Sequence, residues 1–304
     1  MLRYIIRRLI QGVFVMVGVS FVVFGLLFLN GDPVSLMLPQ DASKAEIEKF
    51  RQDLGFNDPF LVQYVRFIGK AVTGDLGRSL FENRPTVTLV MERLPATIQL
   101  ATAAMTIAIL IAFPVGIISA VKRGSIFDRI GMLLALLGQS IPVFWLGLLM
   151  ILLFAVNLGW LPTSGYGWRE IIMPAIALGL FSTARTTRLV RSTMLEVLSQ
   201  EYIRTARSKG LWQMIIVRRH ALKNALIPII TVLGLDFATL LGGAVITETI
   251  FAWPGIGQLA IDSIGRKDYP VVQAIVLIVA LSYVLINLAV DIIYAYLNPR
   301  IRFS

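Results

Sequence analysis

The sequence predicts an all-α membrane protein that crosses the bilayer six times, and three observations lead to this fold class. The 304 residues are 57% hydrophobic and only 15% charged, which departs from the composition of soluble domains. Apolar runs of about 20 residues, the length that a helix needs to cross the hydrocarbon core, occur repeatedly. Basic residues gather in alternate connecting segments, as the positive-inside rule expects of a multi-pass protein.

The apolar runs define where the six spans are expected. They are Leu9–Leu29, Pro95–Val121, Ile130–Ala155, Ile171–Leu189, Ala225–Ile250 and Val271–Tyr294. The first run follows three arginines, as in a signal peptide, but it is longer than a signal peptide's apolar region and lacks a small-residue cleavage pattern, so we interpret it as a retained helix. The prolines in or near the spans are expected to kink rather than break them, because neighbouring helices can satisfy the freed carbonyls; they are Pro114, Pro142, Pro174 and Pro228.

The charge distribution predicts the orientation. Lys and Arg clearly outnumber acids at both termini and in segments 122–129 and 185–223, whereas the two signs balance in segments 30–94, 156–170 and 251–270. Both termini and the 185–223 segment are therefore expected in the cytoplasm. The net charge of +10 then reflects topology, and no nucleic-acid partner is expected.

The chain is expected to divide into two parts. Residues 1–94 form the first helix and an external, periplasmic segment with a helical pattern around 42–54, an aromatic-rich stretch at Phe60–Phe67, and turns at Gly74-Asp75 and Asn83-Arg84-Pro85. Residues 95–304 form a five-helix core that carries the cytoplasmic loop 185–224.

Composition and motifs exclude several kinds of chemistry. The chain has no cysteine and a single histidine, His220, which leaves no set of soft ligands for a metal. No phosphate-binding P-loop is present, and the loose G-x-G-x-x-A match at Gly255–Ala260 follows Trp253-Pro254 in a loop rather than a strand. No cofactor is expected on this chain, and with no catalytic pair visible it is not expected to be an enzyme.

Three acids stand within or at the ends of spans, where a charge is costly and marks a functional hypothesis. Asp236 has two open interpretations: a polar group that faces a pore, or a hydrogen-bond partner for a neighbouring helix. Glu248 lies near the outer end of the same span. Asp291 lies near the inner end of the last span, where we favour a structural role close to Arg300 and Arg302.

The 185–223 segment is the least membrane-like part of the core. From Val190 to Ala206 apolar residues recur with a helical period, and Gly210 follows Lys209 as a natural helix C-cap. Trp212–Leu222 then begins a second helix. Two helices that meet at a glycine elbow form a stiff cytoplasmic projection that could dock a soluble partner; an amphipathic helix that lies flat on the anionic leaflet is the alternative.

Particular motifs carry a resemblance to a known family. They are Thr205–Gly210, His220–Pro228, Gly31-Asp-Pro33, Gly74–Gly77 with Ser79-Leu80, Arg93–Thr97, Gly159–Pro162, Glu248–Gly257, Asp268–Pro270 and Asp291–Tyr294 with Asn298–Arg300. The sequence resembles ABC importer permeases of the dipeptide, oligopeptide and nickel group, in the form of the first permease subunit, which pairs with a second, similar one. The resemblance implies the type I importer architecture in a bacterial or archaeal cytoplasmic membrane.

In this family the loop forms a coupling helix that docks in a cleft of the ATPase subunit. The matching residues are Arg204, Thr205, Ala206, Arg207, Ser208, Lys209, Gly210 and Leu211. The family's glutamate and proline are absent, because Arg204 and Lys223 occupy their places. The implied partners are a second permease, two ATPase subunits that bind ATP and magnesium, an extracytoplasmic binding protein and membrane lipid.

The resemblance also places an outer gate at Glu248–Gly257. Candidate residues of the gate or the translocation path are Gln139, Asp236, Glu248, Trp253, Pro254 and Gly255; a packing loop with an interfacial tryptophan is the alternative for the gate. The implied function is import of dipeptides or oligopeptides, with nickel, glutathione or a sugar as alternatives. An autonomous secondary transporter or channel is the rival from another class.

Overall fold

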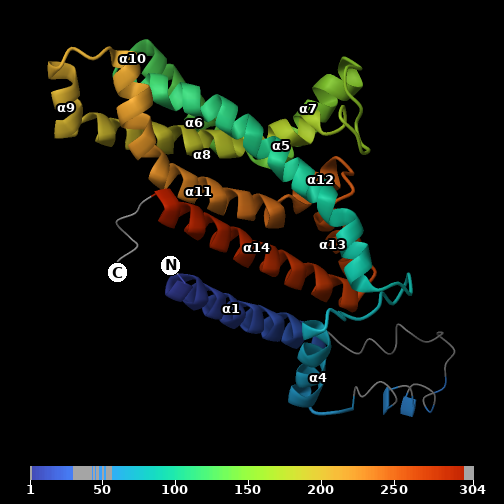
Figure 1. Ribbon diagram of the computed structural model, residues 1–304. Helices are drawn as coiled ribbons and strands as arrows, with labels where there is room; N and C mark the ends of the chain where they lie inside the picture. The colour runs from blue at the N-terminus through green and yellow to red at the C-terminus, as the bar shows by residue number, and fades with distance from the viewer. Residues whose placement is uncertain are drawn as a thin grey trace.

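The computed structural model describes residues 2–29, 43, 45, 48–49, 51–52 and 57–297. These residues form an array of helices in which the long ones run side by side (Figure 1). In chain order the helices are α1 (Leu2–Leu29), α4 (Phe60–Val72), α5 (Thr86–Val121), α6 (Ile126–Ser140), α7 (Val143–Met150), the π-helical η1 (Ile151–Asn157), α8 (Ile172–Leu198), α9 (Glu201–Ser208), α10 (Gln213–Ile215), the π-helical η2 (Ile216–Ala221), α11 (Leu222–Gly243), α12 (Val245–Ile250), α13 (Ile256–Gly265) and α14 (Tyr269–Leu297).

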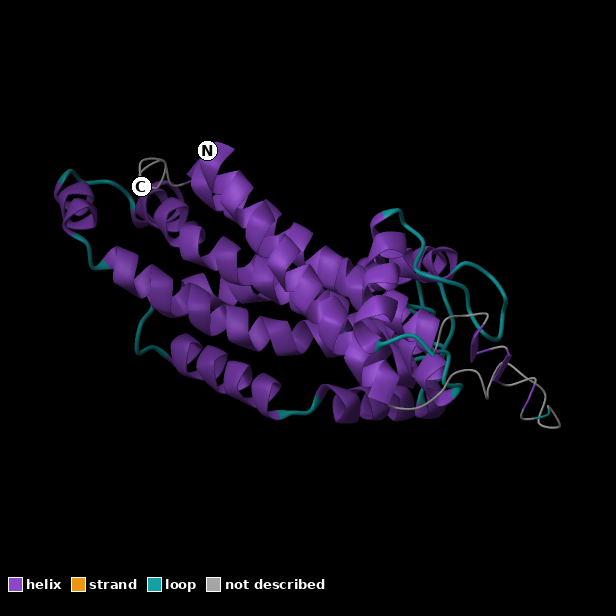
Figure 2. Cartoon of the chain, turned by 90° about the horizontal axis from the view of Figure 1, so that it is seen from below, coloured by secondary structure: helices purple, strands orange, loops and turns teal. Residues whose placement is uncertain are grey.

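The two ends of the array differ. The beginning of α1 and the end of α14 lie at the same end as α9 and α10, whereas α4 and α13 lie at the opposite end (Figure 1). Figure 2 shows the same lengthwise arrangement, with loops gathered towards the two ends. This arrangement agrees with an even number of crossings. The side of the membrane on which each end lies remains a prediction from charge.

Length and apolarity identify four candidate spans among the described residues: Ile6–Leu26, Thr86–Val121, Gln213–Gly242 and Tyr269–Ile293. The bent pair Ile126–Ser140 and Val143–Asn157 adds a fifth if it is one broken span. The remaining expected span, Ile171–Leu189, corresponds to α8. This helix is less apolar because arginines and threonines interrupt it. The all-α polytopic class is confirmed, and the number six stays a prediction.

The expectation that Pro142 only kinks its span is wrong. α6 ends at Ser140, Ile141 and Pro142 are extended, and α7 leaves at 95°. The residue before a proline is pushed out of the helical region, which explains why Ile141 ends α6. Pro95, Pro114 and Pro228 lie inside continuous helices, so α5 starts at Thr86, before the expected start at Pro95.

α8 extends beyond its expected end at Leu189, as far as Leu198. Arg185 and Arg188, which belong to the segment 185–223 that charge predicts to be cytoplasmic, therefore lie in the middle of a long helix. The single helical pattern from Val190 to Ala206 is also interrupted, because Gln200 is extended (ψ 149°) and α9 begins anew at Glu201. Charge alone placed the loop boundary too early.

Among the described helices, α5 and α8 form the most extensive contact, and their backbones approach closely. An added Cβ on Gly179 would lie 2.8 Å from the Ala104 carbonyl oxygen, and one on Gly116 would lie 2.8 Å from the Val190 side chain. Small residues at such contacts allow membrane helices to approach closely. Leu100, Ala101 and other buried residues fill the core between α5, α8 and α11.

α1 is attached to the array at both of its ends. Near its start Arg8 forms an ion pair with Asp291 of α14 (Nε–Oδ2 2.9 Å), so Asp291 contacts α1. Its expected neighbours, Arg300 and Arg302, lie outside the described residues, as do Gly31-Asp-Pro33, Asn298–Arg300 and most of the pattern at 42–54. Near its other end, the aromatic side chains of α1 pack on those of α4: Phe21 and Phe24 against Phe60 and Tyr64, and Phe24 against Phe67.

Candidate functional site

The projection that sequence places in the cytoplasm is a short helix held between two turns. α9 ends at Ser208, and Gly210 adopts φ +74°, a left-handed conformation that glycine accepts without strain. The Gly210 N–H donates to the Arg207 carbonyl (2.9 Å) and the Leu211 N–H to the Ala206 carbonyl (3.3 Å). Gly210 is thus the expected helix C-cap, and the chain turns there towards α10.

α9 presents one face to solvent and the other to the chain's own core. Ile203 and Ala206 are buried beside Ile216 and Val217 of η2, as the helical period predicts. Ala206 is only 7% exposed, so it is not available for the close contact with a partner that the resemblance implied. The exposed coupling-loop residues are Arg204, Thr205, Arg207, Ser208, Lys209, Gly210 and Leu211.

A hydrogen bond ties α9 to the beginning of α11. Asn224 Nδ2 donates to the Tyr202 hydroxyl oxygen (2.8 Å) and to the His220 carbonyl (3.2 Å). Asn224 of the His220–Pro228 motif therefore connects the projection, through Tyr202, to the helix that returns to the membrane. Together with the buried face of α9, this contact attaches α9 firmly to η2 and α11.

Among the residues that the structure describes, Glu248 is the most buried acid, and it organises the segment expected to form the gate. Its side chain is fully buried. Oε1 accepts from the Thr97 hydroxyl (2.7 Å), and Oε2 accepts from the N–H groups of Gly257 (2.7 Å) and Gln258 (3.1 Å). The carboxylate thus caps the first turn of α13, where free N–H groups favour a negative partner. It also joins α13 to α5.

The gate segment is packed so closely around this carboxylate that glycine is required. An added Cβ on Gly255 would collide with the Glu248 carboxylate, and one on Gly257 would lie 2.6 Å from Val245 Cα. Trp253 is 1% exposed, and its indole N–H donates to the Ala96 carbonyl (2.8 Å). These contacts fit the packing alternative for Glu248, which is fully enclosed. Trp253 is almost as buried, but it is one of the residues that line an open groove beside the segment.

An open groove of about 810 Å³ lies beside the gate segment. Its polar lining comes from α5, where Gln99, Thr102 and Thr106 recur at helical spacing. The Tyr166 hydroxyl donates to Gln99 Oε1 (2.8 Å), and the Tyr166 ring lies 4.9 Å from that of Trp253. In the sequence, only the helical recurrence of these polar residues points to the groove.

The two other path candidates are each held by an arginine of α8. Asp236 Oδ1 accepts from Arg185 Nη1 (2.8 Å), while its second oxygen is buried without a recorded partner. Gln139 Oε1 accepts from Arg188 Nη2. Asp236 thus has the hydrogen bond to a neighbouring helix that one interpretation predicts. The pore-facing interpretation stays a prediction; the Arg185 side chain is 53% exposed on this chain. Sequence reasoning missed both arginines.

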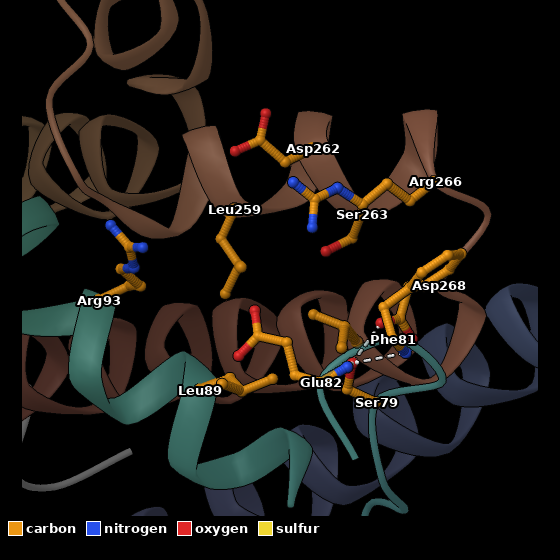
Figure 3. Close-up of a pocket in the computed structure, with 11 residues that line it drawn as sticks. Ser79, Phe81, Glu82, Leu89, Arg93, Leu259, Asp262, Ser263, Arg266 and Asp268 are labelled. Atoms are coloured by element: carbon orange, nitrogen blue, oxygen red, sulfur yellow. Dashed lines mark hydrogen bonds between the residues drawn. The ribbon is translucent and has the colours of Figure 1, made fainter. Parts of the chain in front are cut away.

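A small polar pocket of about 110 Å³ lies at the opposite end from α9 (Figure 3). The Ser79 hydroxyl donates to Asp268 Oδ2 (2.5 Å), which brings two of the recognised motifs together. Arg93 of α5, Asp262 of α13 and Arg266, which follows the end of α13, surround the space (Figure 3). The pocket mixes both charge signs, so it favours no one charge class of ligand.

Comparison with solved structures defines the class of protein. A chain of the inward-facing MetNI methionine ABC transporter superposes with a TM-score of 0.59 at 25% identity, covering 69% of this chain and 96% of that one. A chain of an amino acid ABC transporter superposes with a TM-score of 0.52 at 19% identity, covering 70% of this chain and 94% of that one, and shows the fold alone. The fold is that of an ABC importer permease.

Sequence comparison then gives the family. Residues 112–303 match the family described as binding-protein-dependent transport system inner membrane component, and residues 1–101 match its N-terminal counterpart. The chain belongs to this family of multi-pass proteins of the bacterial inner membrane. The resemblance inferred from the motifs is thereby confirmed.

The similar relatives are peptide and glutathione permeases. The dipeptide transport system permease protein DppB of Alkalihalophilus pseudofirmus is 43% identical, and the glutathione transport system permease protein GsiC of Pectobacterium atrosepticum is also 43% identical. GsiC of Escherichia coli K12 is 42% identical. In each case the match covers 100% of both chains. The relatives are transport permeases rather than enzymes.

Proposed function

We propose that this chain forms half of the translocation path of an ATP-driven importer of small peptides. The observation that carries the proposal is the full-length identity of 43% to a dipeptide permease and a glutathione permease alike. Dipeptides and glutathione share a free amino group, amide bonds and at least one free carboxylate. A second, similar permease subunit supplies the other half of the path, and an extracytoplasmic binding protein delivers the peptide. Nickel and sugars remain the alternatives within the group.

The energy for transport comes from two partner ATPase subunits that bind ATP and magnesium, and α9 is the coupling element that they contact. The exposed and basic surface of α9 and its rigid attachment to η2 and α11 support this role. When the ATPases close, a displacement of α9 passes to α11 as a rigid-body shift. A helix that lies flat on the leaflet fits less well, because the apolar face of α9 is buried in the chain's own core.

Reconstitution tests the proposal. The complete complex in proteoliposomes, with its binding protein, should accumulate radiolabelled alanyl-alanine or glutathione only when ATP reaches the ATPase subunits. Nickel ion and a labelled disaccharide serve as the competing substrates. A complex with an ATPase subunit that cannot hydrolyse ATP is the matched control. ATP-driven uptake of nickel or the sugar with no uptake of either peptide would reject the peptide assignment.

A further inference from the structure

Three arginines recur at every third residue along α8, and each is bound to another helix. Arg185 pairs with Asp236 of α11, Arg188 with Gln139 of α6, and Arg191 with Asp128 of α6 through two hydrogen bonds of 2.6 and 2.8 Å. Residues three apart are neighbours on a helix surface. The arginines therefore form a ladder between α6 and α11.

The rungs of this ladder differ in charge. Arg185 and Arg191 each face a carboxylate, at 2.8 and 2.6 Å. Arg188 bonds to the neutral amide of Gln139, and no ion pair is recorded for it within the described part of the chain. Its guanidinium is exposed on the surface of this chain. The middle rung thus carries an uncompensated positive charge.

The place of Arg188 in the fold says what this charge can face. It is the seventeenth residue of a 27-residue helix in a multi-pass membrane protein. α8 packs against α5 and α11, which carry candidate spans, and an arginine at membrane depth costs at least about 2.5 kcal/mol against lipid. Such residues face a water-filled cavity or another protein surface. On the proposed function, that surface faces the path shared with the second permease subunit.

A second, independent feature marks the same place. Gln139, the partner of Arg188, is the penultimate residue of α6, immediately before the 95° break at Ile141-Pro142. Backbone that departs from a helix at membrane depth is tolerated where it is buried in protein or lines a cavity. Gln139 and Ser140 are exposed, so the break opens onto the same surface as Arg188.

We propose that Arg188, oriented by Gln139, binds the free carboxylate of the peptide during translocation. The inference rests on the proposed function and names the group of the substrate that this chain recognises. A guanidinium has five N–H donors, and the bond to Gln139 uses only one nitrogen. The remaining donors can hold a carboxylate through two parallel hydrogen bonds, the geometry in which arginine binds carboxylates most strongly. The neighbouring arginines, Arg185 and Arg191, are each paired with a carboxylate and do not compete for the anion.

The test compares a peptide acid with its amide. Radiolabelled alanyl-alanine and alanyl-alaninamide are each supplied at a concentration that saturates the binding protein, so that delivery is equal. Wild-type complex in proteoliposomes should import the acid faster than the amide. Arg188→Gln should lower uptake of the acid about 10-fold or more, the effect of losing a hydrogen bond between charged groups, and leave uptake of the amide nearly unchanged. Arg129→Gln, which removes an exposed arginine at the beginning of α6, is the matched control.

Two further measurements keep the test decisive. Arg188→Lys retains the charge and should retain the preference for the acid, which covers the case in which the glutamine variant does not assemble. Equal loss of acid and amide uptake in the Arg188 variants, or no loss of either, overturns the inference. So does weaker co-purification of the second permease with an unchanged acid-to-amide ratio, because Arg188 would then pair with an acid of that subunit. Failure of the wild type to import either peptide would instead reject the peptide function itself.

Discussion

Removal of the Glu248 carboxylate should loosen the outer end of the permease. In Glu248→Ala the Thr97 hydroxyl and the Gly257 N–H lose a buried acceptor. Each buried group left without a partner costs about 1–3 kcal/mol, and the side-chain cavity adds to this. The expected loss is therefore about 3–6 kcal/mol. Glu248→Gln keeps the volume and an acceptor oxygen for α13, so its loss should stay near 1 kcal/mol.

The assay is recovery of the detergent-solubilised complex by gel filtration after heating. About 1 kcal/mol shifts the melting temperature of a chain of this size by a few degrees, so the alanine variant should melt on the order of 10 °C below the wild type and the glutamine variant close to it. Equal melting of all three proteins would refute the assignment of Glu248 as the residue that joins α13 to α5. A drop shared equally by both variants would show that the negative charge, rather than the hydrogen bonds, holds the segment.

Three further outcomes follow from the same contacts. Gly210→Glu should abolish ATP-driven uptake while the complex still elutes intact, because an added Cβ meets nothing in this chain within 4 Å and the left-handed backbone adds a strain of only about 1–2 kcal/mol; Gly210→Asn, which tolerates the left-handed conformation, should retain most uptake, and wild-type uptake by the glutamate variant would contradict the coupling role. Asp268→Ala should lower the free energy of unfolding by about 2–3 kcal/mol, since it removes the buried acceptor of the Ser79 hydroxyl. Recovery after heating measures this loss, and the isosteric Asp268→Asn is the milder control. Asp128→Ala should destabilise the complex by about 3–5 kcal/mol because it leaves Arg191 partly buried without its acid; a double variant, Asp128→Leu with Arg191→Met, should recover most of this loss, and additive losses would contradict the pairing.

The sequence predicted the all-α polytopic class and most of the apolar spans because both depend on local composition. Runs of apolar residues show where helices cross, and the left-handed glycine at Gly210 is visible from its place after Lys209. The break at Pro142 was not predictable in the same way. Hydropathy records how apolar a segment is and not its direction, and Pro114 and Pro228, with the same residue type, stay inside continuous helices.

The α8 ladder shows why the candidate site was harder to predict than the fold. Arg185 and Asp236 are 51 residues apart in sequence, and Arg188 and Gln139 are 49 apart. An arginine whose partner is unknown is counted as a loop residue, which placed the end of α8 too early. The spacing of Arg185, Arg188 and Arg191 by three was the available signal, since it places all three near one face of a helix.

Glu248 was identified from sequence, but its contacts were not. A carboxylate near the end of a span is equally consistent with a wet gate and with a buried cap. Only the fold brings it to the first turn of α13 and to Thr97 of α5. The only sign of this packing in the sequence is the pair of glycines that follow, Gly255 and Gly257. A side chain at either position would meet the carboxylate or the Val245 backbone.

The central claim is that this permease imports peptides by coupling to ATP hydrolysis in partner subunits. The most direct measurement is uptake of radiolabelled alanyl-alanine by proteoliposomes that hold the complete complex and its binding protein, with and without ATP. The account predicts accumulation that needs ATP and the binding protein and disappears in Gly210→Glu. Accumulation by this chain without the ATPase subunits would contradict it.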